Sequence, residues 1–206
     1  KQQVRLRQEA LRREAVEKAA DYDTVLLIGG QNHNQDLEGM DREDMKLPYG
    51  QDALIFELLR VNPNVIVVMI SGSPVEMPWA DQVKALIWQY YSGMEGGTAL
   101  AEALFGEINP SGRLAETFPV RSGDCSAHSI GEFPGGKKVR YKEGIFVGYR
   151  HYNTRGIPVL FPFGHGLSYT EFSIHDLHAE TETADGTCNV RLTLSVTNTG
   201  SRAGKE

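Results

Sequence analysis

The chain has 206 residues, of which 40% are hydrophobic and 23% are charged, and its formal net charge at neutral pH is −6. This length fits one large domain, or one domain with part of a second, and the apolar content suffices for a buried core. The negative charge excludes the dense basic surface that nucleic acids and anionic membranes require. We therefore expect neither a nucleic-acid partner nor a membrane partner.

Two further features bear on the compartment. No apolar run approaches the roughly 20 residues of a spanning helix, and the chain opens with a charged helical pattern where a signal peptide would have an apolar core. Cys125 and Cys188 lie far apart in segments of different character, which permits a disulfide but does not indicate one.

The first part of the sequence alternates between helical and strand patterns. The helical patterns cover residues 2–20, 48–61, 79–83 and 96–105, and the strand patterns cover residues 24–28, 65–70 and 85–88. Residues 65–70 are apolar without alternation, which is typical of a strand covered on both faces of a parallel sheet. Because the elements alternate, right-handed βαβ crossovers are expected, and residues 1–120 are predicted to form an α/β domain.

After Pro119 the pattern changes. Residues 121–140 are rich in Gly, Ser and Lys and have little periodicity, so we expect a long extended connection. Residues 141–169 are dense in aromatics and glycines, and these aromatics are expected to pack on a neighbouring surface more often than to stack on a sugar. Residues 121–170 are therefore predicted to form a connection that packs on the α/β domain.

The last segment, residues 171–206, alternates apolar and polar residues, as half-buried antiparallel strands do. Only two such strands fit, and two strands do not make an independent sandwich. The predicted fold class is therefore α/β, a partial parallel-sheet sandwich with a flavodoxin-like layer, followed by a truncated antiparallel β segment. Unpaired strand edges predict disorder, strand exchange or association between chains, so an oligomer is possible.

A polar segment, residues 31–42, follows the first strand and the pair Gly29-Gly30. The carboxyl ends of parallel strands are where α/β proteins place ligand chemistry. The segment is rich in carboxylates and amides and is too long for a minimal turn, so it is the best candidate for a functional loop.

Five side chains of this loop are candidates, and each has a less specific interpretation. The carboxylates are Asp36, Glu38 and Asp41; Asp41 next to Arg42 favours an ion pair that fixes the loop. His33 among amides could bind a hydroxyl-rich ligand, although an exposed loop histidine is the commoner case. Since no second His or Cys stands at ligand spacing, we predict no metal site.

Other conspicuous residues favour structural roles. Glu95 directly precedes a predicted helix and is expected to complement its dipole, with substrate contact as the alternative. Trp79 lies among apolar residues and is expected in the core, with sugar stacking as the alternative. Gly96-Gly97 does not complete a phosphate-binding motif, so no nucleotide or other cofactor is predicted.

Short motifs along the chain resemble, in order, the C-terminal half of the β-glucosidases of glycoside hydrolase family 3. They are Glu38-Gly39-Met40-Asp41-Arg42 with Leu47-Pro48, Asn62-Pro63-Asn64, Gly72-Ser73-Pro74-Val75 with Met77-Pro78-Trp79, Gly93-Met94-Glu95-Gly96-Gly97, Leu104-Phe105-Gly106 with Asn109-Pro110-Ser111-Gly112, Thr117-Phe118-Pro119, Tyr141-Lys142-Glu143-Gly144 with Gly148-Tyr149-Arg150, and Phe161-Pro162-Phe163-Gly164-His165-Gly166-Leu167-Ser168-Tyr169. The resemblance covers nearly the whole chain and rests on no single motif.

The resemblance implies an architecture of three domains: a TIM barrel with a nucleophilic aspartate, an α/β sandwich domain with an acid/base glutamate on a loop, and a fibronectin type III-like domain. It implies that this chain corresponds to part of the second domain and the start of the third. The barrel and the first part of the sandwich are expected to lie outside it, because of an inserted PA14 module, a boundary or cleavage. A periplasmic or secreted location is suspected from the family alone.

The chemistry of such enzymes requires two carboxyl groups about 5 to 5.5 Å apart, one attacking the anomeric carbon and one protonating the leaving oxygen. The acid keeps its proton through burial or through the neighbouring carboxylate. The resemblance places this acid/base at Glu38 and gives the nucleophile no counterpart. It therefore implies an exo-acting β-glucosidase, acting on a β-glucoside or oligosaccharide, whose isolated fragment is inactive without its TIM-barrel partner.

The same resemblance does not identify substrate-binding residues, for which His33, Asp41 and Arg42 remain candidates. A hypothesis of a different class is a noncatalytic α/β interaction module that docks a protein through the surface a barrel would cover. It predicts that the fragment alone captures a protein partner in a pull-down, and failure to detect one would weaken it.

Overall fold

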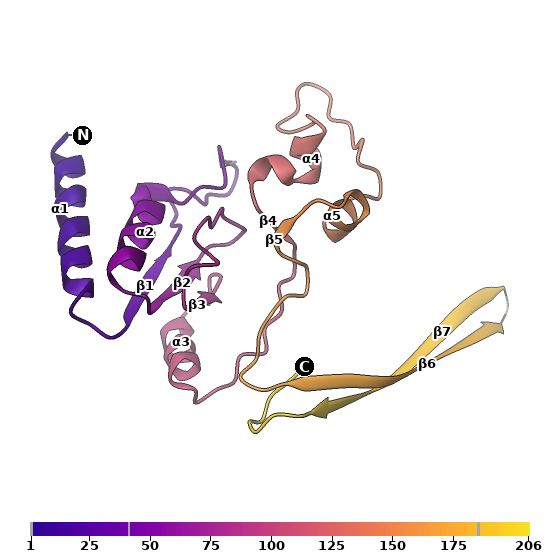
Figure 1. Ribbon diagram of the computed structural model, residues 1–206. Coiled ribbons are helices and arrows are strands. Elements are labelled where there is room, and N and C mark those ends of the chain that lie inside the picture. Colours follow the sequence, from indigo (N-terminus) through magenta and orange to yellow (C-terminus); the bar gives the residue numbers. More distant parts are fainter. Residues whose placement is uncertain (1, 41, 185) are drawn as a thin grey trace. The chain divides into compact units, whose positions relative to one another are not determined.

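The computed structural model (Figure 1) describes residues 2–40, 42–184 and 186–206. These residues form two compact units. Unit 1 comprises Lys1–Gly96 and Glu116–Phe163, and unit 2 comprises Gly97–Ala115 and Gly164–Glu206. The predicted domain bounds at residues 120 and 170 stay a prediction.

A parallel sheet forms the centre of unit 1, in the order β1 (Val25–Gly30), β2 (Val65–Ile70) and β3 (Ala85–Trp88). Val25 pairs with Val65 and Gly30 with Ile70, so β1 and β2 end at the same level. The middle strand is buried, and its residues Val65, Val67, Val68 and Met69 are fully inaccessible to solvent. The predicted parallel sheet and α/β class are confirmed.

Two helices accompany the sheet, α1 (Gln2–Ala19) and α2 (Gln51–Val61), and they pack on each other. Asn62 joins their ends, because its side-chain amide donates to the backbone oxygens of Ala19 at 3.0 Å and Tyr22 at 2.6 Å. Pro48 opens only a 3₁₀ turn, η1 (Pro48–Gly50), and α2 follows it. No described helix has the length and apolar character needed to span a bilayer.

Two predicted elements differ from the structure. Residues 79–83 form turns, with single backbone bonds such as Gln82 N to Trp79 O, in place of the predicted helical piece. Residues 121–140 are not wholly extended, since they contain η2 (Ser122–Asp124) and α4 (Ser126–Ser129). Both errors concern pieces too short to show hydrophobic periodicity, which therefore could not identify them.

The remainder of unit 1 adds β4 (Phe118–Pro119), α5 (Tyr149–Arg155) and β5 (Val159–Phe161). β4 and β5 pair antiparallel. Phe118 is 1% exposed, and its ring lies 4.7 Å from that of Trp88, so this pair of strands closes part of the core. The helix α5 was not predicted from the sequence.

Unit 2 contains most of α3 (Gly96–Phe105) and a long antiparallel hairpin, β6 (Phe172–Ala184) and β7 (Thr187–Asn198). Pairing runs from Phe172 with Asn198 to Ala184 with Thr187, with a register shift between His175 and His178. The described strand residues pair with each other, and the expected disorder or strand exchange stays a prediction. Every residue of β7 is exposed, so association between chains stays a prediction.

Candidate active-site loop

The candidate loop, residues 31–42, leaves β1 at the carboxyl edge of the sheet. A side chain could not replace the hydrogen of Gly30, because a Cβ atom there would lie 1.8 Å from the backbone oxygen of Ile70. Gln51, the first residue of α2, fixes this point: its Oε1 accepts from Gly30 N and its Nε2 donates to Gly30 O, both at 2.8 Å. The root of the loop is therefore held by a strand and a helix.

Glu38 lies at the tip of a tight turn within the loop. Leu37 and Met40 pair across the turn, with Met40 N donating to Leu37 O at 3.4 Å. Gly39 has a φ of 76°, the left-handed conformation that the second central residue of a type II turn requires. Glu38 is exposed, and the described residues offer it no hydrogen-bond partner. Its carboxyl group is therefore available to a molecule that approaches the loop.

Two phenols hold the part of the loop that precedes this turn. Gln35 Nε2 donates to Tyr49 Oη at 2.8 Å, and Tyr91 Oη donates to Asp36 Oδ2 at 2.8 Å. Partial desolvation and the bond to Asp36 raise the pKa of Tyr91, so this phenol remains a donor at neutral pH. Gly72 gives the pair room, because a Cβ there would approach Asp36 Oδ2 to 2.7 Å.

Arg42 holds the other end of the loop. Its Nη1 donates to Gln31 Oε1 at 2.9 Å, while its Nη2 donates to Ser73 Oγ at 2.9 Å and to Pro74 O at 3.0 Å. Gln31 is only 8% exposed, so the clamp connects the loop to a buried anchor and to the segment after β2. The predicted partner of Arg42, Asp41, lies outside the described residues; the acceptors found here are neutral.

The other sequence candidates take these positions. His33 is exposed in the turn that begins the loop. Glu95 is exposed directly before the first residue of α3, where its chain position puts it next to the helix N-terminus. Trp79 is fully buried and its Nε1 donates to Asp52 Oδ1 at 2.7 Å, which confirms the core interpretation. Within the described ranges, no cluster of three His, Cys, Asp or Glu side chains could hold a metal ion.

Sequence reasoning missed Glu116. Burial raises the pKa of this carboxyl group, and the positive charge of Arg42 acts in the opposite direction. Its negative charge in turn contributes to the raised pKa of Tyr90, whose main cause is burial. The only signal in the sequence is an acidic residue two positions before the buried Phe118, and that spacing alone does not distinguish it from a solvated residue.

The parallel sheet makes this an α/β protein, and its clamped acidic loop lies at the carboxyl edge, where proteins of this class place their ligand and catalytic sites. The sequence matches the family "Glycosyl hydrolase family 3 C-terminal domain" over residues 2–169. The chain therefore belongs to glycoside hydrolase family 3.

Its relatives include proteins named β-glucosidase. It is 46% identical to beta-glucosidase BoGH3A of Bacteroides ovatus over 96% of this chain and 27% of the relative. It is 45% identical to thermostable beta-glucosidase B of Acetivibrio thermocellus, over 96% of this chain and 26% of the relative. The chain thus spans about a quarter of the length of the curated relatives it matches.

Solved structures of proteins named β-glucosidase also match the chain. A β-glucosidase from Kluyveromyces marxianus matches with a TM-score of 0.86 and 38% identity over 95% of this chain and 23% of that one. The β-glucosidase DesR from Streptomyces venezuelae, solved in complex with D-glucose, matches with a TM-score of 0.88 and 37% identity over 95% of this chain and 25% of that one.

Proposed function

We propose that the chain is part of a retaining, exo-acting β-glucosidase that hydrolyses terminal β-linked glucose, with Glu38 as the general acid/base. The observation that carries this proposal is the placement of Glu38 at the exposed tip of a turn, on a loop that Arg42 and Gln51 fix at the sheet edge. A general acid needs this combination, because it must reach a substrate oxygen and yet be held in one position.

The surroundings of the loop favour Glu38 over Asp36. Asp36 Oδ2 already accepts a hydrogen bond from Tyr91, which gives that carboxylate a role in holding the loop. Glu38 makes no such bond with the described residues, so its carboxyl group is available for a substrate. The names of the relatives, and the D-glucose with which the Streptomyces venezuelae enzyme was solved, support a glucoside as the substrate.

The rest of the mechanism depends on the complete protein. A retaining glycosidase places its nucleophile about 5 to 5.5 Å from the acid/base, and in this proposal the nucleophile is an aspartate of a TIM barrel. Glu38 first donates a proton to the leaving oxygen and then takes one from the water that hydrolyses the glycosyl-enzyme. The 206-residue chain alone is therefore inactive and needs the barrel as its partner.

The test is Glu38→Gln in the full-length protein. Hydrolysis of methyl β-glucoside, whose leaving group needs a proton, should fall by about 10² to 10⁴-fold. Release of 2,4-dinitrophenol from the corresponding glucoside should be largely spared in its first turnover, because this leaving group needs no proton. Azide should then accelerate turnover by replacing water at the step that needs a base.

Two control variants accompany this test. Glu17→Gln, an exposed carboxylate on α1, should leave both rates unchanged. Asp36→Asn preserves an acceptor for Tyr91 and should retain most activity on both substrates. Equal loss of both activities in Glu38→Gln, without rescue by azide, would contradict the assignment of Glu38.

A further inference from the structure

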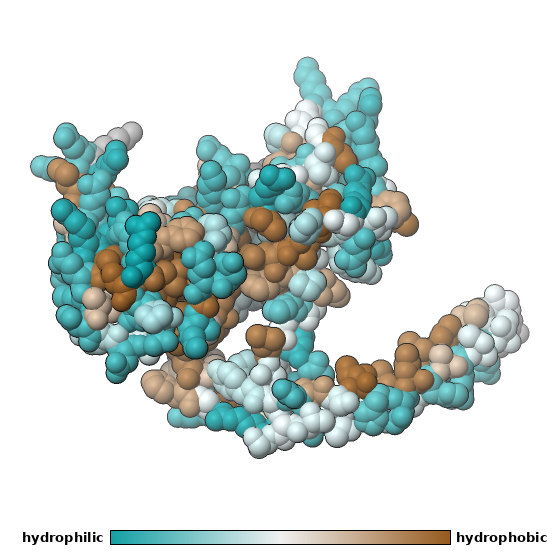
Figure 2. All heavy atoms as spheres, in the orientation of Figure 1, coloured by the Kyte–Doolittle hydropathy of each residue, from teal (hydrophilic) through white to brown (hydrophobic). Residues whose placement is uncertain are grey.

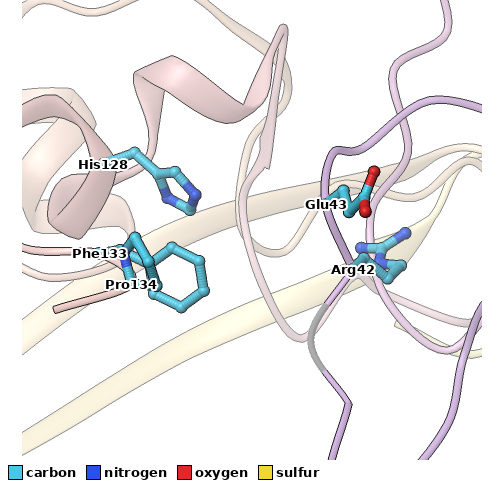
Figure 3. A pocket seen from close by; sticks show the side chains of 5 residues that line it. All are labelled: Arg42, Glu43, His128, Phe133 and Pro134. Carbon is cyan, nitrogen blue, oxygen red and sulfur yellow. The ribbon is translucent and has the colours of Figure 1, made fainter. Parts of the chain in front are cut away.

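Unit 1 contains an open pocket of about 330 Å³ next to the candidate loop, lined by Arg42, Glu43, His128, Phe133 and Pro134. Figure 3 shows the rings of His128 and Phe133 on one wall and the charged side chains of Arg42 and Glu43 on the other. The pocket is therefore aromatic on one side and ionic on the other.

The aromatic wall is held in place by local structure. The rings of His128 and Phe133 have centroids 4.6 Å apart and planes inclined by 35°. The turn between these residues is closed by backbone bonds, Gly131 N to His128 O at 3.0 Å and Glu132 N to Ala127 O at 2.9 Å. Glu132 also forms an ion pair with Lys142. Phe133 nevertheless remains 40% exposed, so its ring has apolar surface available to a ligand.

On the ionic wall, Arg42 is also fixed before a ligand arrives. Arg42 is clamped by its bonds to Gln31, Ser73 and Pro74. It lies four residues after Glu38, so the two Cα atoms are at most about 14 Å apart even in a fully extended chain. The pocket is therefore lined in part by the residue that ends the loop carrying Glu38.

We propose that this pocket binds the sugar on the leaving-group side of the scissile bond, a β-linked hexopyranose, which rests on the function proposed above. A β-pyranose has faces of C–H groups that pack on aromatic rings, and a rim of hydroxyls that accept from a guanidinium and donate to a carboxylate. The volume lies at the lower end of the range for ligand sites. The carboxylate of Glu43 disfavours a phosphate or another anion as the occupant.

The test compares two substrates of the full-length enzyme that both need a proton on the leaving oxygen. Cellobiose places a second glucose in the pocket, whereas methyl β-glucoside leaves it empty. Phe133→Ala should lower kcat/KM for cellobiose about five- to tenfold and change that for methyl β-glucoside less than about twofold. Phe146→Ala is the matched control, because Phe146 is also 40% exposed and does not line the pocket.

A binding measurement separates this inference from the function on which it rests. In the Glu38→Gln protein, cellobiose should bind more tightly than methyl β-glucoside, and Phe133→Ala or His128→Ala should each remove most of that difference. Loss of turnover on both substrates is expected when the acid/base role of Glu38 is removed. Loss confined to cellobiose is expected when sugar binding in the pocket is removed. If Phe133→Ala and His128→Ala leave both the cellobiose rate and the binding difference unchanged, or affect the two sugars equally, the pocket is not this subsite.

Discussion

The acidic side chains of the loop differ in their hydrogen bonds and in their exposure. Asp36 accepts a hydrogen bond from Tyr91, while Glu38 lies at an exposed turn where Gly39 permits a reversal of the chain. A carboxylate already bound to a phenol is less free to exchange a proton with a substrate. Position and bonding, more than residue type, therefore decide which carboxylate is suited to catalysis.

Asp52 is a half-buried acid whose role is structural. It accepts a hydrogen bond from Trp79 Nε1 at 2.7 Å. Burial raises the pKa of Asp52 above its ordinary value of 3.8, and the negative charge of Glu76 adds to this, while Trp79 and Lys46 oppose it. Ionisation is thus less favourable in the folded protein than in the unfolded chain. The stability that neutral Asp52 contributes is complete below pH 3.8 and is lost as the pH rises through the raised pKa.

We expect Asp52→Asn to remove this pH dependence, because the amide keeps an oxygen for Trp79 and cannot ionise. As the pH rises from about 3 to about 7, the unfolding free energy of Asp52→Asn should increase relative to that of the wild type. Asp52→Ala should instead lose about 1 to 3 kcal/mol at both pH values, since it leaves the buried indole N–H without a partner. Urea unfolding followed by tryptophan fluorescence measures this in unit 1, which holds both tryptophans. A constant difference between Asp52→Asn and wild type would contradict the prediction.

At the scale of elements, the sequence predicts well whatever depends on hydrophobic periodicity. The parallel strands and the helices α1 and α3 were expected from the spacing of their apolar residues, although α1 buries only Ala19 and α3 only Gly96. The backbone reversals were not: Tyr49 has a φ of 62°, which delays the start of α2 to Gln51. A left-handed tyrosine has no signature in a hydrophobic pattern.

The candidate loop illustrates the same limit. Its position after β1 could be predicted from the order of apolar and polar residues. Its clamp could not, because Arg42 binds Ser73 and Pro74, which lie 31 and 32 residues further along the chain. Such contacts arise from the pairing of β1 with β2, and a single sequence does not specify them. The pocket wall of His128 and Phe133 was missed for a different reason: it is local, but its helix α4 has only 4 residues and is too short to show hydrophobic periodicity.

The hydrogen bonds of Arg42 lead to a prediction about stability and activity. Arg42→Ala removes three hydrogen bonds at one end of the loop and should lower the unfolding free energy by about 1 to 2 kcal/mol. If the clamp positions Glu38, kcat for methyl β-glucoside in the full-length protein should also fall by about 10 to 100-fold with little change in KM. This substrate leaves the neighbouring pocket empty, so the rate reports the position of the acid.

Two variants complete this experiment. Arg42→Lys retains a donor that can reach one acceptor and should restore part of kcat. Arg60→Ala, at the end of α2 and away from the loop, is the control and should change neither stability nor rate appreciably. A loss of stability in Arg42→Ala without a loss of kcat would restrict the arginine to a structural role.

At the scale of the whole molecule, the hairpin of unit 2 is notable for its row of exposed apolar residues. Apolar residues recur at every second position of β7, and Leu192 and Leu194 are 63% and 46% exposed. Figure 2 shows hydrophobic side chains in a row along this hairpin. A two-stranded sheet with free edges and an apolar face can pair with further strands at its edges. It can also pack its apolar face on another apolar surface.

We therefore expect the 206-residue chain to self-associate through this face in a concentration-dependent manner. Leu192→Lys places a charge in the centre of the apolar row, so it should shift sedimentation velocity profiles towards the monomer at equal protein concentration. Thr193→Lys is the matched control, because successive side chains of a strand point to opposite faces, and it adds the same charge on the polar face. Both variants change residues that are exposed in β7, so neither should affect the folding of unit 1. If the chain sediments as a monomer at all concentrations, or if both lysines act alike, the apolar row is not the surface through which copies meet.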